Sequence, residues 1–481
     1  MFDYACLLCH NAKCTKACGV SEPHRILRSL YFENEEVVEN RMTGELACES
    51  CDGRCESACP MHIRIRSIMQ SLKKAEPEEV IDIDYSLLKT DFCGIPLENP
   101  FLLSSSVVAS TYDMCARAFE AGWAGVSFKT ICLMDIIEAS PRFSAVRGDN
   151  HRIIGFRNIE QLSDQSLQEN LNTFRKLKEN YPDKFLLVSI MGRNEEEWAY
   201  LTEKMNDSGA DALELNFSCP NMTEENTGSD VGQIPELVEQ YCRVVKQHSK
   251  LPFIAKLTPN VTHIEESAEA AIRGGADGVA AINTIKSLIE VDIDPSGRSF
   301  YSSVGGYSGK AVKPIAMRFI AELGKDSLLK GKHISGMGGI ENWFDALEFI
   351  ALGANTVQIT TAVMQYGYRI IDELKDGAAY YLTKQKIGSV NNLRGTALGG
   401  VVPTEKLDRS FVIYPKFLPD RCVGCGRCKV SCMDGGHQAI SIRDDHPVLD
   451  PKRCVGCHLC VLVCPREAIV SSNIKVPKRT Q

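Results

Sequence analysis

Cysteine side chains carry the clearest chemical signal in this sequence. The chain has 481 residues and 21 cysteines, and sixteen of these fall into four runs of four, two near each end. The two C-terminal runs share the spacing C-x2-C-x2-C-x3-C, and Pro465 follows the second run. Two runs with this spacing are typical of a domain that binds two [4Fe-4S] clusters. The fourth cysteine of each run ligates the cluster of the other run. The two predicted ligand sets are Cys422, Cys425, Cys428 and Cys464, and Cys432, Cys454, Cys457 and Cys460.

The N-terminal cysteines have a different spacing, C-x2-C-x4-C-x3-C followed by C-x2-C-x3-C-x3-C-P. Eight thiolates suffice for two further [4Fe-4S] clusters, and Pro23 to Val38 between the runs has helical periodicity. We therefore expect a small helical domain held together by metal centres. Structural zinc also favours sets of four cysteines, so zinc is the alternative at both ends, as are disulfides at the N-terminus. The predicted N-terminal ligands are Cys6, Cys9, Cys14, Cys18, Cys48, Cys51, Cys55 and Cys59.

Charge and hydropathy indicate where the protein works. The first ten residues contain neither a basic n-region nor a long apolar stretch, and no run of about 18 apolar residues occurs. We expect a soluble, cytoplasmic protein, where clustered cysteines usually bind metal. The formal net charge of -8 comes without a basic run, so nothing indicates nucleic-acid binding.

The cysteine-poor middle of the chain must position any further chemistry. Eight short apolar runs alternate there with stretches able to form helices, such as Asn194 to Ser208. Parallel strands need such crossovers, so the pattern predicts a (β/α)8 TIM barrel, with a doubly wound open sheet as the alternative. The predicted strands are Phe101 to Ser106, Gly125 to Ile131, Phe185 to Met191, Ala212 to Cys219, Phe253 to Pro259, Gly278 to Thr284, Ile334 to Ile340 and Thr356 to Val363.

The predicted class is thus α/β, with a barrel between two iron-sulfur domains. We expect the helical iron-sulfur domain over 1–80, the barrel over 91–385, a linker over 386–418 and a two-cluster ferredoxin-like domain over 419–471.

Polar residues end the predicted strands, where active sites of this fold gather. Glycines and hydroxyls after the last two strands suit a phosphate, because backbone N-H groups can approach it closely. The residues are Ser104, Ser105, Lys129, Asn216, Ser218, Cys219, Lys256, Asn283, Thr284, Gly338, Gly339, Thr360 and Thr361.

The iron-sulfur clusters narrow the choice of phosphorylated cofactor. They move single electrons, so they need a two-electron partner to react with organic substrates. Flavin mononucleotide (FMN) can be that partner. No strand is followed by G-x-G-x-x-G, so we predict neither FAD nor NAD(P)H binding in this chain.

Five segments of the middle region resemble one family. LELNFSCPNM (213–222), AKLTPNVT (255–262), AINT (281–284), GGYSGKAVKP (305–314) and GMGGI (336–340) are similar to the FMN barrel of dihydropyrimidine and dihydroorotate dehydrogenases. The resemblance extends to the C-terminal ferredoxin domain. The N-terminal cysteines resemble the first part of the long, single-chain dihydropyrimidine dehydrogenase, whose FAD and NADPH section is missing here. The resemblance therefore implies that a separate FAD- and NAD(P)H-binding flavoprotein subunit supplies electrons. The assembly would be a possible homo-oligomer or heterotetramer.

The resemblance also implies roles for single residues. Cys219 falls on the family's general acid/base, which protonates C5 of the pyrimidine while a hydride reaches C6. Lys256 matches the lysine at the flavin N1 and O2 edge, and Lys129 matches a second flavin-contacting lysine. Ser104 and Ser105 match an Ala-Ser pair, so the first is substituted here. The implied flavin contacts also include Ser308, Gly309, Gly338, Gly339, Thr360 and Thr361.

In the N-terminal domain, the resemblance groups Cys6, Cys9 and Cys14 with Cys59. Cys18, Cys48, Cys51 and Cys55 would then form the second set.

Substrate choice is expected to depend on carboxamides, hydroxyls and one carboxylate. Uracil alternates N-H donors with C=O acceptors, which such groups can pair with. Dihydroorotate dehydrogenases usually have glycine where Glu160 stands, and an anionic Glu160 would repel the carboxylate of orotate. The implied substrate residues are Asn158, Glu160, Asn216, Ser218, Asn283 and Thr284.

The expected activity is therefore the interconversion of uracil or thymine and the 5,6-dihydropyrimidine. A dihydroorotate dehydrogenase, or an FMN-barrel reductase of another cyclic amide or enone, is the enzymatic alternative. An electron-transfer subunit of a larger complex is the alternative of another class.

Overall fold

The computed structural model describes residues 5–9, 11–42, 48, 50–72, 80–148, 152–222, 227–289, 291 and 303–478. The chain forms two compact units, Met1–Gly400 and Val401–Gln481. No helix in the described ranges is long and apolar enough to cross a membrane. None of the cysteines in those ranges forms a disulfide bond.

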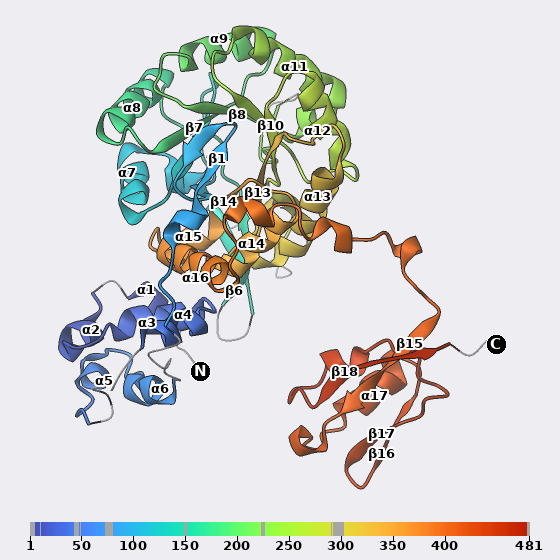
Figure 1. Cartoon of the computed structure of the whole chain (residues 1–481). Helices are drawn as coiled ribbons and strands as arrows, with labels where there is room; N and C mark the ends of the chain where they lie inside the picture. The colour runs from blue at the N-terminus through green and yellow to red at the C-terminus, as the bar shows by residue number, and fades with distance from the viewer. Residues whose placement is uncertain are drawn as a thin grey trace, which may run out of the picture. The chain divides into compact units, whose positions relative to one another are not determined.

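The first unit contains a closed barrel of eight parallel strands in the order β10-β13-β14-β3-β4-β7-β8-β9 (Figure 1). Each predicted strand is present, and the closed order confirms the TIM barrel over the open sheet. Pairing in register brings Asn216 beside Lys256, so polar residues at neighbouring strand ends share one rim. The strands are β3 (Phe101–Leu103), β4 (Gly125–Ile131), β7 (Phe185–Ile190), β8 (Ala212–Asn216), β9 (Phe253–Lys256), β10 (Gly278–Ala281), β13 (His333–Met337) and β14 (Thr356–Ile359).

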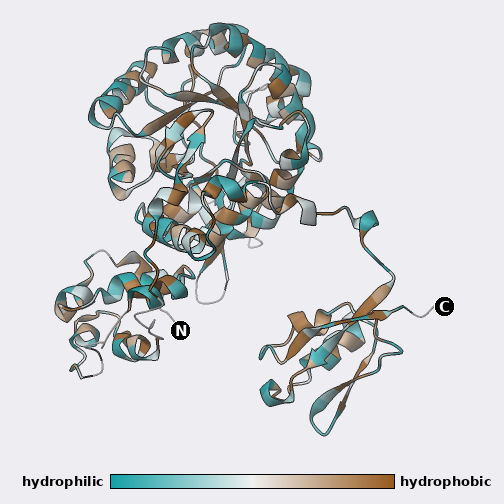
Figure 2. Ribbon diagram, in the orientation of Figure 1, coloured by the Kyte–Doolittle hydropathy of each residue, from teal (hydrophilic) through white to brown (hydrophobic). Residues whose placement is uncertain are grey.

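Amphipathic helices surround the barrel, and hydrophobic residues concentrate in its strands (Figure 2). Side chains cap several of these helices: Ser166 and Asn342 each form a reciprocal capping box with the acidic residue three positions on. The helices are α7 (Tyr112–Ala121), α8 (Leu167–Asn180), α9 (Glu195–Met205), α10 (Ser229–Gly232), α11 (Pro235–His248), α12 (Ile264–Arg273), α13 (Lys313–Lys325), α14 (Trp343–Ala351), α15 (Thr361–Tyr366) and α16 (Ile370–Lys384).

Two small sheets in this unit were not predicted. A hairpin joins β1 (Thr90–Phe92) to β2 (Ile95–Leu97). A four-stranded sheet follows the order β11-β12-β6-β5 and forms from loops inserted between barrel elements. It carries candidate site residues, since it includes both Asn158 and Ser308. Its strands are β5 (Phe143–Arg147), β6 (Ile153–Asn158), β11 (Ile285–Ser287) and β12 (Gly305–Ser308).

The N-terminal segment is helical, as expected. The single periodic stretch predicted from Pro23 to Val38 is broken after Tyr31 into two helices. Cysteines and apolar side chains share its core, where Ile65 and Met69 are fully buried. The domain bounds proposed above stay a prediction. The helices are α1 (Ala5–Leu8), α2 (Lys13–Cys18), α3 (Pro23–Tyr31), α4 (Glu35–Arg41), α5 (Arg54–Ala58) and α6 (Ile65–Ser71).

These N-terminal helices contact α16 of the barrel through buried polar groups. Arg28 Nε donates to Glu373 Oε1 at 2.8 Å, and Asn34 Nδ2 donates to Glu373 Oε2 at 3.1 Å. Further along α16, Arg41 donates to Asp376 at 2.8 Å. Arg369 donates to the carbonyl of Cys9 at 2.9 Å, so the barrel also touches a cysteine run.

Gly377 permits the N-terminal segment to pack closely against α16. A methyl group there would lie 2.1 Å from Trp343 Cδ1 and 2.3 Å from Asn34 Oδ1. We expect Gly377→Ala to lower the free energy of unfolding by about 1–3 kcal/mol, the usual cost of overpacking. Denaturant titration measures this. Gly388→Ala is the control, since its methyl meets only Asn392 Nδ2 at 3.8 Å. Equal stability of the two variants would contradict the packing argument.

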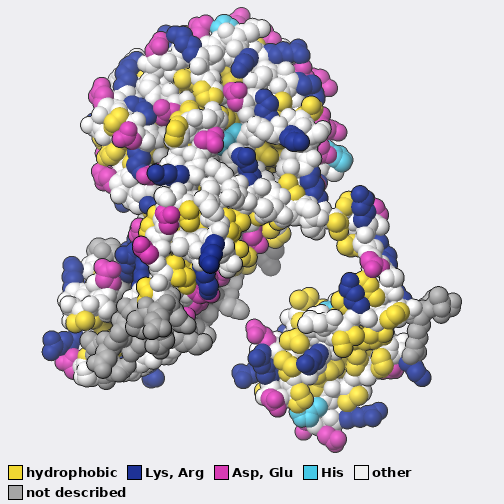
Figure 3. Space-filling view, in the orientation of Figure 1, with side chains coloured by type: hydrophobic (Ala, Val, Ile, Leu, Met, Phe, Trp, Pro, Cys, Tyr) yellow, Lys and Arg dark blue, Asp and Glu magenta, His cyan; other side chains and the backbone are white. Residues whose placement is uncertain are grey.

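The second unit is a small α+β domain. Strand β15 (Phe411–Phe417) pairs with β18 (Ile469–Pro477), and β16 (Ile440–Arg443) pairs with β17 (His446–Leu449). Helices α17 (Arg427–Gly435) and α18 (Leu459–Leu462) lie beside them. Apolar side chains gather on the face shown in Figure 3, and Leu462 is 82% exposed.

Short 3-10 helices occur in both units. They are η3 (Tyr85–Leu88), η4 (Val107–Ala109), η6 (Lys310–Val312), η7 (Val390–Leu393), η8 (Leu398–Gly400), η9 (Thr404–Lys406) and η10 (Pro419–Arg421).

Candidate functional site

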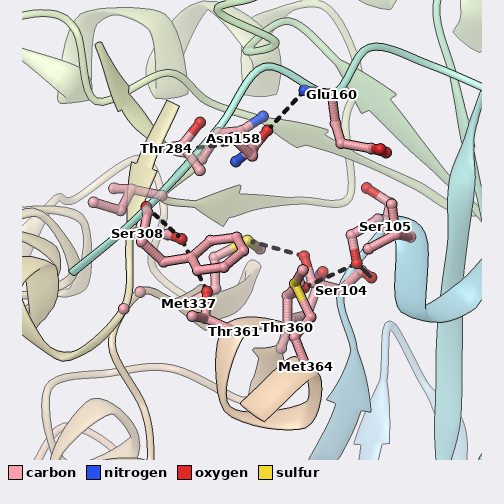
Figure 4. Close-up of a pocket in the computed structure, with 18 of the residues that line it drawn as sticks. Ser104, Ser105, Asn158, Glu160, Thr284, Ser308, Met337, Thr360, Thr361 and Met364 are labelled. Carbon is pink, nitrogen blue, oxygen red and sulfur yellow. Dashed lines mark hydrogen bonds between the residues drawn. The ribbon is translucent and has the colours of Figure 1, made fainter. Parts of the chain in front are cut away.

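A pocket opens at the carboxyl ends of the barrel strands, as active sites of this fold do. Asn158, Glu160 and Thr284 lie along one edge, and Thr360 and Thr361 lie along the opposite edge (Figure 4). Of the barrel residues predicted for the site, those lining the pocket are Ser104, Ser105, Lys129, Asn158, Glu160, Asn216, Cys219, Lys256, Asn283, Thr284, Ser308, Gly309, Gly338, Gly339, Thr360 and Thr361.

Ser218 is the exception, because it is fully buried behind the pocket wall. Its hydroxyl donates to Asn216 Oδ1 at 2.8 Å and accepts from Asn283 Nδ2 at 2.8 Å. Ser218 therefore orients two predicted substrate amides from behind. Asn216 is held on its other side, since its Nδ2 donates to Thr130 Oγ1 at 2.8 Å.

Three glycines form one end of the pocket. Gly309, Gly338 and Gly339 have φ values of 88°, 125° and 78°, which favour glycine. A methyl group on Gly339 would lie 2.8 Å from the backbone nitrogen of Lys313 and 2.9 Å from the carbonyl oxygen of Gly309. The backbone segments therefore come together only because side chains are absent. Such a cradle suits a phosphate group.

Hydroxyl groups complete this end. Ser308 Oγ lies 2.9 Å from Thr361 Oγ1, and Ser106 Oγ lies 3.1 Å from Thr360 Oγ1. These hydroxyls can donate to phosphate oxygens or to a ribityl chain.

Lys256, at the end of β9, also lines the pocket. Its Nζ donates to Ser105 Oγ at 2.9 Å and to Glu214 Oε1 at 3.2 Å. A cation here can stabilise negative charge on a bound ring.

Among the described residues that line the pocket, Gln358, Glu341 and Glu160 each have a buried side-chain oxygen without a hydrogen-bond donor. Glu160 Oε1 is paired with Arg142, which leaves Gln358 Oε1 and Glu341 Oε1 without a partner. Unpaired buried oxygens cost free energy unless a ligand donates to them. Together with the glycine cradle and Lys256, they fit FMN, which has one phosphate, a ring N-H and hydroxyl donors.

Glu160 does not face the pocket as an isolated anion. Lys129 Nζ lies 2.8 Å from its Oε2, and Arg142 lies 2.7 Å from its Oε1. Lys129 also approaches Glu138 at 3.4 Å. The negative charge of Glu160 is thus balanced by two cations. Lys129 forms ion pairs with two carboxylates, those of Glu160 and Glu138.

Cys219 follows β8 and is 6% exposed at the pocket wall. Burial, assisted by the nearby Glu138 carboxylate, raises the pKa of Cys219 to about 11, although Lys256 and Lys129 act in the opposite direction. The thiol is therefore protonated at neutral pH and can donate a proton.

Two cavities of the second unit contain the C-terminal cysteines. One is lined by Cys422, Cys425, Cys428 and Cys464. The other is lined by Cys432, Cys454, Cys457 and Cys460. These are the two crossed sets that the spacing predicted, each brought around one space.

The N-terminal cysteines also separate into two groups. Cys18, Cys48, Cys51 and Cys55 line one cavity. Cys14 and Cys59 are buried in the core of the same segment and do not line this cavity. The cavity contains the second set that the resemblance implied, and the set of Cys6, Cys9, Cys14 and Cys59 stays a prediction.

Sequence reasoning missed several residues at the barrel pocket. Glu214 and Gln358 are polar residues inside apolar strands, a signal that could have identified them. Arg142 and Glu138 lie in the loop after β4, and nothing local relates them to Glu160. Asn221 was not among the predicted substrate residues, yet its Nδ2 donates to the Glu160 carbonyl at 2.8 Å.

Comparisons with known proteins agree with this geometry. The family model described as dihydroorotate dehydrogenase matches residues 87–382, and that of the 4Fe-4S dicluster domain matches residues 417–471. The second match supports iron-sulfur clusters over zinc at the C-terminal cysteines.

Three relatives illustrate the range of similarity. The NAD-dependent dihydropyrimidine dehydrogenase subunit PreA of Escherichia coli K12 is 52% identical over 360 residues, covering 73% of this chain and 87% of the relative. The chloroplastic dihydropyrimidine dehydrogenase (NADP(+)) of Arabidopsis thaliana is 36% identical, covering 70% and 80%. The catalytic subunit of dihydroorotate dehydrogenase B (NAD(+)) of Pyrococcus abyssi is 38% identical, covering 65% and 99%.

Proposed function

We propose, because the chain belongs to the dihydroorotate dehydrogenase family, that it reduces the 5,6 double bond of uracil or thymine, or catalyses the reverse reaction. The chain is an iron-sulfur flavoprotein oxidoreductase, with FMN in the barrel and a 4Fe-4S dicluster domain. We propose in addition that the substrate is a pyrimidine base. It is supported by the similarity to two dihydropyrimidine dehydrogenases and by the pocket chemistry.

The buried thiol of Cys219 at the wall of the pocket is the observation that carries the proposal. Reduction of the double bond needs a hydride at C6 and a proton at C5. FMN supplies the hydride when it is bound. Cys219 donates the proton to C5, and in the reverse direction its thiolate accepts that proton.

The amides hold the pyrimidine for this transfer. Asn216 and Asn283 are fixed through Ser218, and Asn158 Oδ1 accepts from Asn221 Nδ2 at 3.3 Å. Their amide nitrogens can donate to the C=O groups of a pyrimidine, Asn283 Oδ1 can accept from a ring N-H, and Thr284 adds a hydroxyl. Groups already held in place bind with less loss of conformational entropy, so the ring is oriented rather than merely bound.

We propose that electrons enter from a separate FAD subunit that oxidises NAD(P)H, pass through the [4Fe-4S] clusters and reach FMN. The E. coli relative is named as a subunit, which supports a partner. The N-terminal clusters would use the two cysteine groups described above. Sixteen reduced cysteines fit a cytoplasmic setting.

Dihydroorotate is the second candidate substrate. Lys129 and Arg142 balance the charge of Glu160, so repulsion of orotate by this carboxylate is weaker than the sequence alone indicates. The similarity to a dihydroorotate dehydrogenase points the same way.

The test is a mixing experiment with the anaerobically purified, chemically reduced protein. Flavin reoxidation is followed after addition of uracil, thymine, orotate or buffer. We expect fast reoxidation with uracil or thymine alone. A response to orotate would favour the second candidate, and no response to any of the three would reject both and favour an electron-transfer subunit.

A further inference from the structure

Glu214 is a carboxylate enclosed in the interior of the barrel. It lies in the middle of β8, within an otherwise apolar run, and is 0% exposed. An unpaired ionised carboxylate in such a place would be very costly, so its neighbours must compensate the charge. The proposed reaction does not use Glu214 directly.

Four donors converge on this carboxylate. Oε1 accepts from Ser105 Oγ at 2.8 Å, Ser127 Oγ at 3.2 Å and Lys256 Nζ at 3.2 Å. Oε2 accepts from Gln358 Nε2 at 3.0 Å. Burial would raise the pKa of Glu214, but the charge of Lys256 and the hydrogen bonds from Gln358 and Ser105 outweigh it and lower that pKa. Glu214 is therefore ionised at neutral pH.

Lys256 is the cation of this pair and also lines the pocket. It is 2% exposed, and besides Glu214 its Nζ contacts Ser105 Oγ at 2.9 Å and Ser104 Oγ at 3.2 Å. Its positive charge is thus opposed from inside the barrel while it faces the ligand. Ser127 and Glu214 do not line the pocket, so Glu214 acts on a ligand only through its neighbours.

We propose that Glu214 is a positioning residue that partly cancels the charge of Lys256 and thereby lowers the reduction potential of FMN in the pocket. Reduction adds electron density to the ring, which a lone ammonium group stabilises more than an ion pair does. The effect is large in a buried site, because little water screens it. The inference rests on the proposed function only in placing FMN in this pocket.

Glu214→Gln tests the proposal in the full holoprotein. Glutamine keeps the shape and one acceptor oxygen but removes the charge. We expect the redox equilibrium of the bound FMN to shift at least tenfold toward the reduced form, about 30 mV for a two-electron couple. Glu214→Asp keeps the charge and should remain near the wild-type potential. Both are measured by spectroelectrochemical titration without any pyrimidine.

A structural role alone predicts a different result. If Glu214 only fills the barrel, Glu214→Gln changes thermal stability and leaves the FMN potential at the wild-type value, which would overturn the proposal. Because no pyrimidine is present, failure of the substrate proposal does not affect this outcome.

A second variant covers the case in which Glu214→Gln does not retain FMN. In Lys256→Gln, Glu214 loses its counter-ion and should take up a proton. Infrared spectra should then show a buried carboxylic acid band that is absent from the wild type and from the Lys256→Gln, Glu214→Gln double variant. A spectrum without that band would refute the ion pair.

Discussion

Replacing Cys219 by alanine is expected to slow reduction of the pyrimidine by about 10²–10⁴-fold, the usual contribution of a positioned general acid. The hydride can still reach C6, but no side chain delivers the proton to C5. Stopped-flow reoxidation of the reduced flavin measures this step. FMN content should remain at the wild-type level, because the thiol is not part of the glycine cradle.

The rates of reduction and oxidation should depend on pH in different ways. Burial raises the pKa of Cys219 to about 11, so the thiol is the dominant form at neutral pH. Reduction, which needs the thiol, should be insensitive to pH in the neutral range and fall only near pH 11. Oxidation of the dihydropyrimidine needs the thiolate, so its rate should rise about tenfold per pH unit below that pKa.

Cys242→Ala is the control for loss of a buried thiol. Cys242 is 0% exposed in α11 and does not line the pocket. Its replacement should leave both rates and their pH profiles unchanged. A Cys219→Ala variant with wild-type rates would remove Cys219 from the proposed chemistry.

Glu373→Ala is expected to lower the free energy of unfolding by about 3–5 kcal/mol, because it leaves the buried guanidinium of Arg28 without its buried partner. Glu373 is 0% exposed, and its Oε1 accepts from Arg28 Nε at 2.8 Å. The remaining partner of Arg28 is Asp372 at 3.1 Å, whose side chain is 46% exposed and compensates only in part. We expect the N-terminal helices to separate from α16 before the barrel unfolds.

Denaturant titration combined with limited proteolysis of the N-terminal segment measures this loss. Lys384→Met is the matched control, since Lys384 and Glu36 join the same two parts at 2.9 Å but are 40% and 60% exposed. An exposed pair of this kind contributes little, so stability should not change measurably. Arg28→Met combined with Glu373→Met should recover most of the loss, because no charge then remains buried. A Glu373→Ala variant as stable as Lys384→Met would contradict the argument.

Local patterns were sufficient for the architecture. Each barrel strand is a short apolar run followed by a polar residue, and its position can be recognised within about ten residues. The C-terminal cysteines repeat one spacing, which determines the two ligand sets before any folding is considered. Strand ends were less accurate: the run predicted from Ala212 to Cys219 is a strand only as far as Asn216. Hydropathy does not show where pairing stops.

Contacts between distant segments were not accessible from the sequence. Arg28 and Glu373 are 345 positions apart, and neither residue has a local pattern that indicates the other. The sheet of β5, β6, β11 and β12 forms from barrel insertions whose pairing depends on the closed barrel beneath them. For the same reason, the sequence showed Glu160 as a lone acid, whereas the fold places Lys129 and Arg142 against it.

The sequence by itself therefore determined the kind of protein: a barrel with polar residues at its strand ends, and cysteines spaced for iron-sulfur clusters. These are properties of periodicity and spacing, which act over a few residues. The tertiary structure alone decided the electrostatics of the site, including the buried pair of Glu214 and Lys256 and the raised pKa of Cys219. Charge and burial depend on which groups meet in space, and that is settled only when the barrel closes.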